Sequence, residues 1–208
     1  MVGSDKITLV EAEMKKDNNC FAKQVELYKP EFIMHTACPF MQGMNLDQNK
    51  EEQNSYIKST ASLIDAAIEC SSTKKIVFTG AATSVVGATP ETEKDYVYSD
   101  ALHWADPNSF TNPNEKAKIL AERVCWNRIS KYQNDQTGAS RLHLSTILPY
   151  FMVGPPLTKF ISENNSSCKA ISRIIHSKEE TYPNVCLPTV DVRDVAWAHI
   201  LSCFNPTL

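Results

Sequence analysis

Few side chains in this sequence have a type and spacing that suggest chemistry. His35 and His199 lie within apolar stretches, where we expect a histidine to pack or to form a hydrogen bond. The seven cysteines include no C-x-x-C pair, and no spacing of His, Cys, Asp or Glu predicts a metal site. Asp191 and Asp194 come just before or within a helical pattern, so we expect them to cap that helix.

Asn114 and Lys118 form a more informative pair at the start of a predicted helix. Because they are four residues apart, a helix places both side chains on the same face. A neutral amide cannot give up and recover a proton near neutral pH, so Asn114 cannot act as an acid or a base. Of this pair, only Lys118 carries a charge.

Short β-branched runs alternate with longer amphipathic stretches along the chain. Strands are predicted at residues 7–10, 31–35, 75–79 and 144–148, and helices at 18–28, 57–68, 114–132 and 191–203. This alternation predicts an α/β fold with a parallel sheet between helices. In the last helix, the apolar spacing predicts an inward face made of Val192, Val195, Ala196, His199 and Ile200. The polar stretch 88–114 is predicted to be a long loop at the ligand-binding edge of the sheet.

The composition is that of one ordinary globular domain. The chain has 208 residues, 42% of them hydrophobic, and a formal net charge of -3, which gives no basic footprint for nucleic acid or an anionic membrane. The sequence contains neither a signal-peptide pattern nor an apolar run of the ~20 residues that a membrane span needs. We therefore expect a cytoplasmic protein with reduced cysteines.

Glycine is scarce, and this bears on nucleotide binding. The chain has six glycines; Gly3 stands alone and the next is Gly43. No G-x-x-G-x-x-G turn is present, although such a turn is what lets backbone amides and a helix N-terminus hold a pyrophosphate. The sequence therefore offers no phosphate loop of this kind.

Six segments resemble, in the same order, the extended short-chain dehydrogenase/reductase family. Its dihydroflavonol-reductase, cinnamoyl-CoA-reductase and 3β-hydroxysteroid-dehydrogenase-like branch is the most similar. The segments are residues 7–14 (ITLVEAEM), 35–39 (HTACP), 74–79 (KKIVFT), 116–122 (KAKILAE), 148–155 (LPYFMVGP) and 191–200 (DVRDVAWAHI).

The resemblance implies an incomplete Rossmann-like, doubly wound parallel sheet that binds NADP or NAD. In the family pattern, Glu13 ends the third strand, at the position that contacts adenine, and Ala37 lies along the cofactor. Pro149 falls in the strand exit near the nicotinamide, and Lys118 at the lysine that binds the nicotinamide ribose. The implied reaction is the NAD(P)-dependent interconversion of a CH–OH and a C=O group in a small molecule.

The family reaction uses a Ser–Tyr–Lys set, and two of the three positions differ here. Asn114 stands where the pattern has the proton-transferring tyrosine. Ala81 stands where it has the serine that polarises the substrate oxygen, or Ala82 does if the register slips by one. Asn112 does not restore the tyrosine if Lys116 is taken as the lysine instead.

Two tyrosines in the predicted loop, Tyr96 and Tyr98, are the remaining candidates for a phenol that reaches the site. Measured against the family pattern, residues 1–208 are expected to form one partial domain. It would begin at the third strand, without the Gly-rich loop, and lack most of the carboxyl-terminal substrate lobe. An exposed sheet edge would then favour self-association.

Two functions remain open from the sequence. The first is an NAD(P)-dependent oxidoreductase. The second is a catalytically inactive remnant or pseudoenzyme that acts, if at all, as a binding protein. The combined loss of the phosphate loop, the tyrosine and the serine favours the second for present chemistry, since one general acid–base group alone contributes ~10²–10⁴-fold in rate.

Overall fold

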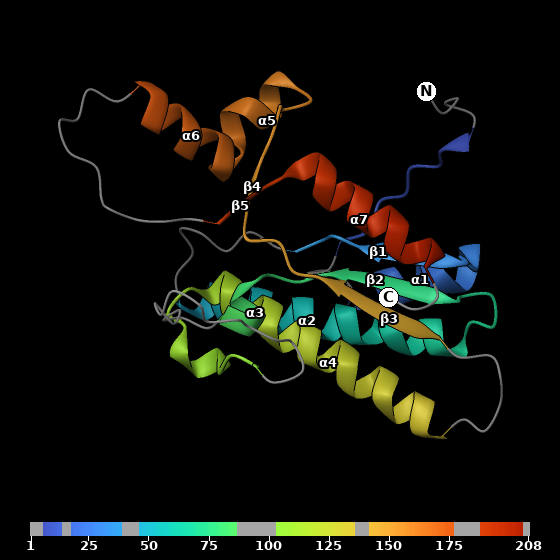
Figure 1. The fold of residues 1–208 in the computed structure, drawn as a ribbon. Coiled ribbons are helices and arrows are strands. Elements are labelled where there is room, and N and C mark those ends of the chain that lie inside the picture. The colour runs from blue at the N-terminus through green and yellow to red at the C-terminus, as the bar shows by residue number, and fades with distance from the viewer. Residues whose placement is uncertain are drawn as a thin grey trace.

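The computed structural model has a parallel three-stranded sheet with helices on both faces (Figure 1). It describes residues 6–13, 18–38, 46–86, 103–135, 142–176 and 188–205. The sheet order is β1-β2-β3, from strands β1 (Phe32–His35), β2 (Lys75–Thr79) and β3 (His143–Ile147). This confirms the α/β, Rossmann-like class that the alternating pattern predicts.

One face of this sheet carries the main core. It is covered by helices α1 (Cys20–Tyr28), α2 (Leu46–Glu69) and α4 (Pro113–Asp135). From β2, Ile76 and Phe78 are fully buried against them, and each such side chain contributes ~1.5–3 kcal/mol by leaving water. Because β2 is the central strand, Val77 is fully buried on the other face too.

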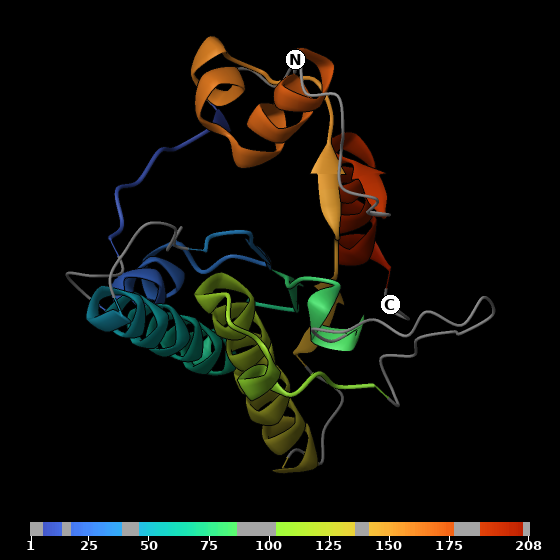
Figure 2. The ribbon, with the colours of Figure 1, turned by 90° about the vertical axis from the view of Figure 1, so that its left-hand side faces the viewer.

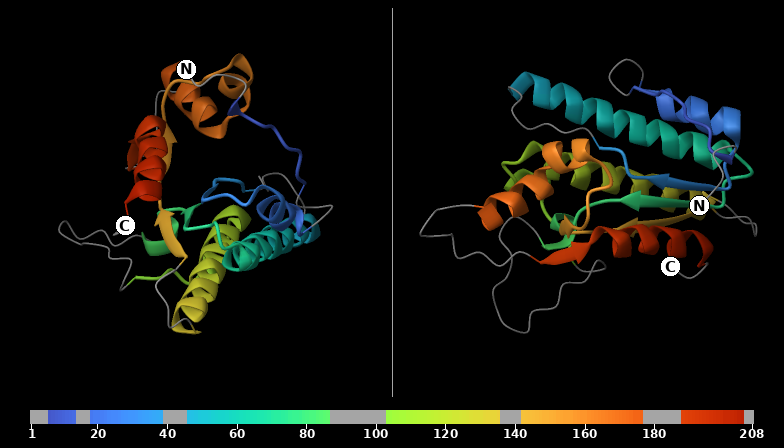
Figure 3. Two further views of the ribbon diagram at one scale, coloured as in Figure 1. Left: turned by 90° about the vertical axis from the view of Figure 1, so that its right-hand side faces the viewer. Right: turned by 90° about the horizontal axis from the view of Figure 1, so that it is seen from above.

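Helix α7 (Val192–Phe204) covers the opposite face, beside β2 and β3 (Figure 3). Asp191 caps it as predicted, since its carboxylate accepts a hydrogen bond from the Arg193 backbone N–H. The predicted inward face is partly wrong. Val195 and His199 are buried, but Val192, Ala196 and Ile200 are exposed, because α7 turns toward the sheet along a line that continues through Ser202 and Cys203.

The predicted strand at residues 7–10 is not formed. Residues 7–13 are extended but pair with no strand, and Figure 2 shows this segment outside the sheet. Ile7, Leu9 and Val10 are 59%, 93% and 46% exposed, so its apolar side chains are not packed against a sheet. A β-branched run becomes a strand only where a neighbouring strand accepts its backbone hydrogen bonds.

A small second sheet was not predicted. It pairs strands β4 (Phe151–Val153) and β5 (Thr189–Asp191) in parallel and precedes α7. Between these strands, helices α5 (Lys159–Asn164) and α6 (Ser166–His176) form an arm on the α7 side of the main sheet (Figures 1 and 2). Two further short helices, α3 (Thr83–Val86) and a 3₁₀ turn (Pro107–Ser109), flank the carboxyl end of β2 and the start of α4.

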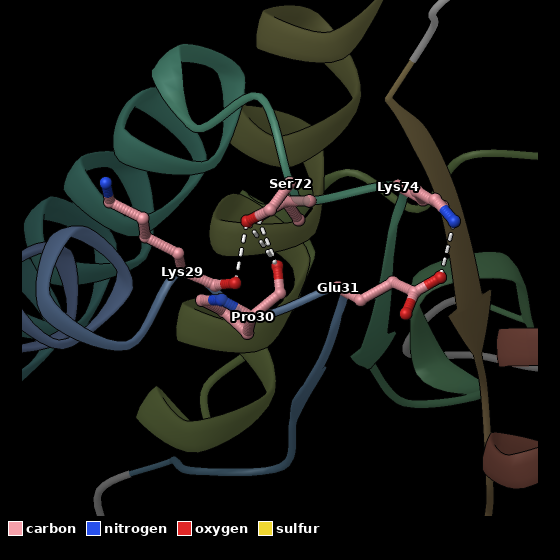
Figure 4. A network of polar contacts seen from close by, with 6 residues as sticks. Lys29, Pro30, Glu31, Ser72 and Lys74 are labelled. Carbon is pink, nitrogen blue, oxygen red and sulfur yellow. Dashed lines mark hydrogen bonds and ion pairs between the residues drawn. The ribbon is translucent and has the colours of Figure 1, made fainter.

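Polar contacts between two loops hold the amino ends of β1 and β2 together (Figure 4). The Ser72 hydroxyl lies 2.7 Å from the Lys29 carbonyl oxygen and 3.3 Å from that of Pro30, and Lys74 forms an ion pair with Glu31. The Lys74 N–H also donates to the Glu31 carbonyl. These contacts fix the register in which Phe32 lies beside Lys75.

Candidate functional site

The carboxyl ends of β2 and β3 are joined by backbone hydrogen bonds just after the strands end. The Gly80 N–H donates to the Ile147 carbonyl and the Ala82 N–H to the Pro149 carbonyl, both at 3.0 Å. Two predicted site residues, Ala81 and Pro149, are thereby brought together at the edge where parallel sheets bind ligands. Pro149 is buried and Ala81 half-buried.

Lys118 reaches this edge from α4. Its Nζ lies 3.5 Å from the Gly80 carbonyl oxygen, a long contact for a hydrogen bond, and the side chain is half-buried. Lys118 is also close enough to Cys38, at the end of β1, for its positive charge to act on the thiol. Burial raises the pKa of Cys38, and the Lys118 charge opposes that rise. Lys118 therefore lies between the ends of β1 and β2, and Ala37 is the exposed residue next to Cys38.

Asn114 takes part in the hydrogen bonds of the first turn of α4. Its backbone N–H and its side-chain amide both lie within hydrogen-bond distance of Asn112 Oδ1, at 3.0 and 3.3 Å. Asn112 immediately precedes Pro113, the first helical residue, so it occupies the N-cap position, with proline at its preferred place. Asn114 thus shares the face of Lys118, as its spacing predicts, while its amide takes part in the helix cap.

Glu13 is not brought to this edge by any strand. It is exposed in the extended segment 7–13, which does not pair with the sheet. The predicted assignment of Glu13 to the adenine end of a cofactor site depends on a strand that the structure lacks. Tyr96 and Tyr98, the other candidates for a phenol, lie outside the described residues.

The sequence did not predict the group of buried polar side chains that lies behind Lys118. Glu122 follows Lys118 by one helical turn and is 2% exposed. Its Oε2 would be 2.9 Å from a Cβ placed on Gly80, so the carboxylate lies directly against the end of β2. Burial raises the pKa of Tyr56 well above its usual value, and Cys38, Cys125 and Glu122 add to that rise. Because Glu122 follows Lys118 by one helical turn, the sequence could have indicated that the two side chains share a face of the helix.

Both histidines that lie in apolar stretches are packed and hydrogen-bonded, as predicted. His35 Nε2 is 3.1 Å from Thr60 Oγ1, and burial lowers the pKa of His35 to about 4. His199 Nδ1 lies 2.7 Å from the Val195 carbonyl, so it donates there, and Nε2 accepts from the Thr79 hydroxyl at 2.6 Å. His199 thus ties α7 to the last residue of β2.

The described ranges contain neither a metal-binding cluster nor a membrane-spanning helix. No group of three or more His, Cys, Asp and Glu side chains in those ranges is placed to hold a metal ion. Nor does any helix within them have the length and apolarity to cross a membrane.

The parallel sheet, its covering helices and the segments at its carboxyl edge define a Rossmann-like α/β protein. A family-model match places it in the extended short-chain dehydrogenase/reductase class. Residues 13–205 match the sequence model of the 3-beta hydroxysteroid dehydrogenase/isomerase family. The chain belongs to that family.

Curated relatives include plant and yeast reductases. A cinnamoyl-CoA reductase of Medicago truncatula is 28% identical over 178 residues, which cover 83% of this chain and 50% of the relative. An NADPH-dependent methylglyoxal reductase of Saccharomyces cerevisiae is 22% identical over 183 residues, which cover 82% and 51%. The chain spans about half the length of the curated relatives it matches.

Solved structures share the fold. A yeast methylglyoxal/isovaleraldehyde reductase complexed with NADPH superposes with a TM-score of 0.77 at 18% identity, covering 94% of this chain and 59% of that one. Vestitone reductase from alfalfa superposes with a TM-score of 0.61 at 19% identity, covering 98% and 59%. At this level of identity the comparison establishes the architecture alone.

Proposed function

We propose that this chain carries the nicotinamide side of an NAD(P)-dependent oxidoreductase acting on a CH–OH or C=O group, and that it transfers hydride at most weakly. The observation that carries the proposal is the position of Lys118, half-buried at the carboxyl edge and within reach of Gly80 next to Ala81. The names of the relatives, which include several carbonyl reductases, support the same reaction class.

The residues present fit one end of the cofactor. Ala37 follows β1 and Pro149 follows β3, and Lys118 reaches the same edge from within α4; a nicotinamide and its ribose would lie there. The other end has no such support, since the sequence has no G-x-x-G-x-x-G turn and Glu13 lies in an unpaired segment. The name of one curated relative, an NADPH-dependent methylglyoxal reductase, makes NADP(H) the first cofactor to test.

When bound, the nicotinamide would supply or accept the hydride at the substrate carbon. In this chain, the Lys118 ammonium would donate hydrogen bonds to a ribose hydroxyl in place of its long contact to Gly80. Asn114 cannot supply the proton, because its amide does not exchange a proton near neutral pH and is already bonded to Asn112. The Ala81 methyl cannot polarise a substrate oxygen.

The same observations favour a second candidate, a catalytically inactive pseudoenzyme that acts by binding. Asn114 is part of a complete helix cap, so the position has a structural role without any chemistry. We propose the cytoplasm as the compartment for either candidate, since the six described cysteines form no disulfide. With a net charge of -3, the partner in either case would be a small molecule or a protein, not a nucleic acid.

Cofactor binding separates the two candidates. NADPH and NADH would be titrated into the purified chain by calorimetry and by nicotinamide fluorescence, together with Lys118→Met. The matched control is Lys116→Met, because Lys116 lies on the same helix but contacts Asn108 at 3.4 Å. We expect weak binding, on the order of millimolar without a phosphate loop, which Lys118→Met weakens about tenfold and Lys116→Met leaves unchanged.

Each other outcome has a definite meaning. No saturable binding by the wild-type chain would overturn the oxidoreductase proposal and support the inactive candidate. Equal binding by wild type and Lys118→Met would show that Lys118 does not face the cofactor. Sub-millimolar binding would contradict the argument that the missing glycine turn weakens affinity.

The proton step is tested by restoring the family side chains. We expect Asn114→Tyr with Ala81→Ser to raise NADPH-dependent reduction of small aldehydes and ketones by about 10²-fold or more over wild type, since a general acid and an oxygen-polarising hydroxyl return together. NADPH oxidation would be followed by absorbance, with each single variant as a control. A chain that binds NADPH but gains no turnover would show that these positions do not correspond to the family's tyrosine and serine.

A further inference from the structure

Helix α7 has apolar side chains on two opposite faces. Its inner face packs against the main sheet and includes the buried Val195 and Cys203. Its outer face carries side chains at intervals of three and four residues, each between 38% and 72% exposed: Trp197, Ile200, Leu201 and Phe204. Beyond its first turn, α7 contains no Asp, Glu, Lys or Arg. Because a helix that is apolar all round is normally buried all round, we expect a partner to cover this outer face.

The arm formed by α5 and α6 also lacks a cover. No residue of either helix is buried. The arm nevertheless carries apolar side chains that are each between 36% and 73% exposed: Phe160, Ile161, Ile171, Ile174 and Ile175. Helices of six and eleven residues are marginal in water by themselves, and most of the stability of such helices comes from the packing of an apolar face. The arm should therefore gain stability from a partner.

The two sets of apolar side chains are available together. Both α7 and the arm lie on the same side of the main sheet (Figures 1 and 2). In the part of the chain that the structure describes, α7 packs against β2, β3 and β5, whereas α6 packs against α5 and β4. Each set presents on the order of 450 Å² of apolar surface, and the two together present roughly 900 Å² per copy.

We propose that two copies of this chain form a dimer in which the outer face of α7 in each copy packs on the arm of the other. In a twofold interface, a contact from one copy to its partner is repeated in the opposite direction. The helices match in length, with eleven residues in α6 and thirteen in α7. The dimer would bury roughly the ~800 Å² per partner that stable interfaces bury, and α7 against α7 would bury only about half of this.

The chemistry of these faces favours a second copy as the partner. None of the apolar side chains that form them is charged, so like charges do not oppose the contact. Homodimer interfaces are also more apolar than the interfaces of transient complexes. The proposal is independent of Lys118 and of the nicotinamide edge.

The test is sedimentation velocity of the purified chain over a range of concentrations. We expect wild type to dimerise, and Trp197→Lys/Leu201→Lys on α7 and Ile174→Glu/Ile175→Glu on α6 each to weaken dimerisation at least about 10²-fold. The matched control is Leu27→Lys/Tyr28→Lys, which replaces two adjacent exposed apolar side chains of α1 and should dimerise as wild type does. All these positions lie on the surface, so the variants should fold normally, which circular dichroism would verify.

Mixing the α7 variant with the α6 variant tests the arrangement itself. In the proposed dimer, the mixed pair keeps one contact intact and places the new lysines opposite the new glutamates, so we expect the mixture to dimerise where neither variant does alone. A mixture that stays monomeric would overturn the arrangement. Wild type that remains monomeric up to about 100 μM, or variants that dimerise as wild type does, would overturn the proposal and leave these faces to a different polypeptide.

Discussion

At the scale of single residues, the proposed site combines one charged side chain, Lys118, with two positions that offer no acid–base chemistry. Lys118 lies at the sheet edge, where the Gly80 carbonyl and the Cys38 thiol are its neighbours. In the proposed assignment, Asn114 and Ala81 occupy the places of a proton donor and an oxygen-polarising hydroxyl, and neither an amide nor a methyl group can perform these roles. Buried polar side chains lie behind them, and Glu122, which is 2% exposed, is one of these.

His35 makes stability depend on pH. Burial lowers its folded-state pKa to about 4 from 6.5, so the unfolded chain binds the proton more readily. The contribution of neutral His35 to the free energy of unfolding is therefore complete above pH 6.5. As the pH falls from 6.5 toward 4, the free energy of unfolding decreases by ~3 kcal/mol in total, at 1.36 kcal/mol per pKa unit. We expect His35→Gln to flatten the urea-derived stability curve across that window.

The exposed His143 on β3 provides the control for this pH dependence. His143→Gln should leave the slope of stability against pH as in wild type. If His35→Gln and wild type lose the same free energy of unfolding between pH 6.5 and pH 4.5, His35 is not the buried neutral histidine that the structure describes.

At the scale of elements, loops and helix ends decide how the strands meet. Lys29 ends α1 in the left-handed region, with φ of 45°, and its carbonyl accepts the Ser72 hydroxyl. Gly80, at the end of β2, lies against Leu148 and Glu122 so closely that a Cβ would be 2.6 and 2.9 Å from them. Backbone geometry therefore constrains which residue fits at Lys29 and at Gly80, and both lie at junctions that align β1, β2 and β3.

Glycine should suit the end of α1 better than lysine does. A left-handed conformation costs a non-glycine residue ~1–2 kcal/mol, part of which glycine's greater freedom in the unfolded chain offsets. We expect Lys29→Gly to raise the free energy of unfolding by about 0.5–1 kcal/mol, measured in urea. Glu26→Gly, within the same helix, should lower it by about 1 kcal/mol. A loss of stability in Lys29→Gly would mean that the cap is not left-handed.

The end of β2 should not tolerate even one added methyl group. We expect Gly80→Ala to lower the free energy of unfolding by about 1–3 kcal/mol, because Leu148 or Glu122 must move. Ala81→Ser, one residue further on and half-buried, should change it by less than about 0.5 kcal/mol. Equal stability of wild type and Gly80→Ala, measured by thermal melting, would contradict this close packing.

At the scale of the whole molecule, the two faces of the main sheet are covered unequally. Helices α1, α2 and α4 bury one face, whereas α7 lies beside β2 and β3 on the other (Figure 3). Among the described residues, β1 pairs only with β2, so its other edge has no strand beside it. Met34 on β1 is 44% exposed, and Trp197 on α7 is 57% exposed.

We propose that this edge of β1 mediates self-association. An uncharged strand edge offers backbone donors and acceptors to a second copy, and a lysine placed there opposes such pairing. Sedimentation velocity should show a concentration-dependent oligomer for wild type and a shift toward monomer for Met34→Lys. Leu27→Lys, at a 70% exposed leucine on α1, should behave as wild type. A wild-type chain that stays monomeric at all concentrations would contradict the proposal.

Much of the architecture was predictable because burial leaves a local periodic signal. The run Lys75–Thr79 indicated a strand, and the pattern at 114–132 indicated a helix; β2 and α4 confirm both, and Ala117, Ala121, Cys125 and Ile129 are buried on α4. The pairing of β4 with β5 was not predictable, because strands of three residues are too short to show a period. The inner face of α7 was only half predictable, since apolar residues lie on both of its sides.

The sequence by itself determined the alternation of strands β1, β2 and β3 with helices α1, α2 and α4, and the shared face of Asn114 and Lys118, because helical spacing and strand periodicity act within a few residues. Only the tertiary structure decided that residues 7–10 pair with no strand and that Glu122 lies against Gly80. It also placed Lys118 between the ends of two strands. The physical reason is that strand pairing and the convergence of side chains depend on segments tens of residues apart, which local periodicity does not report.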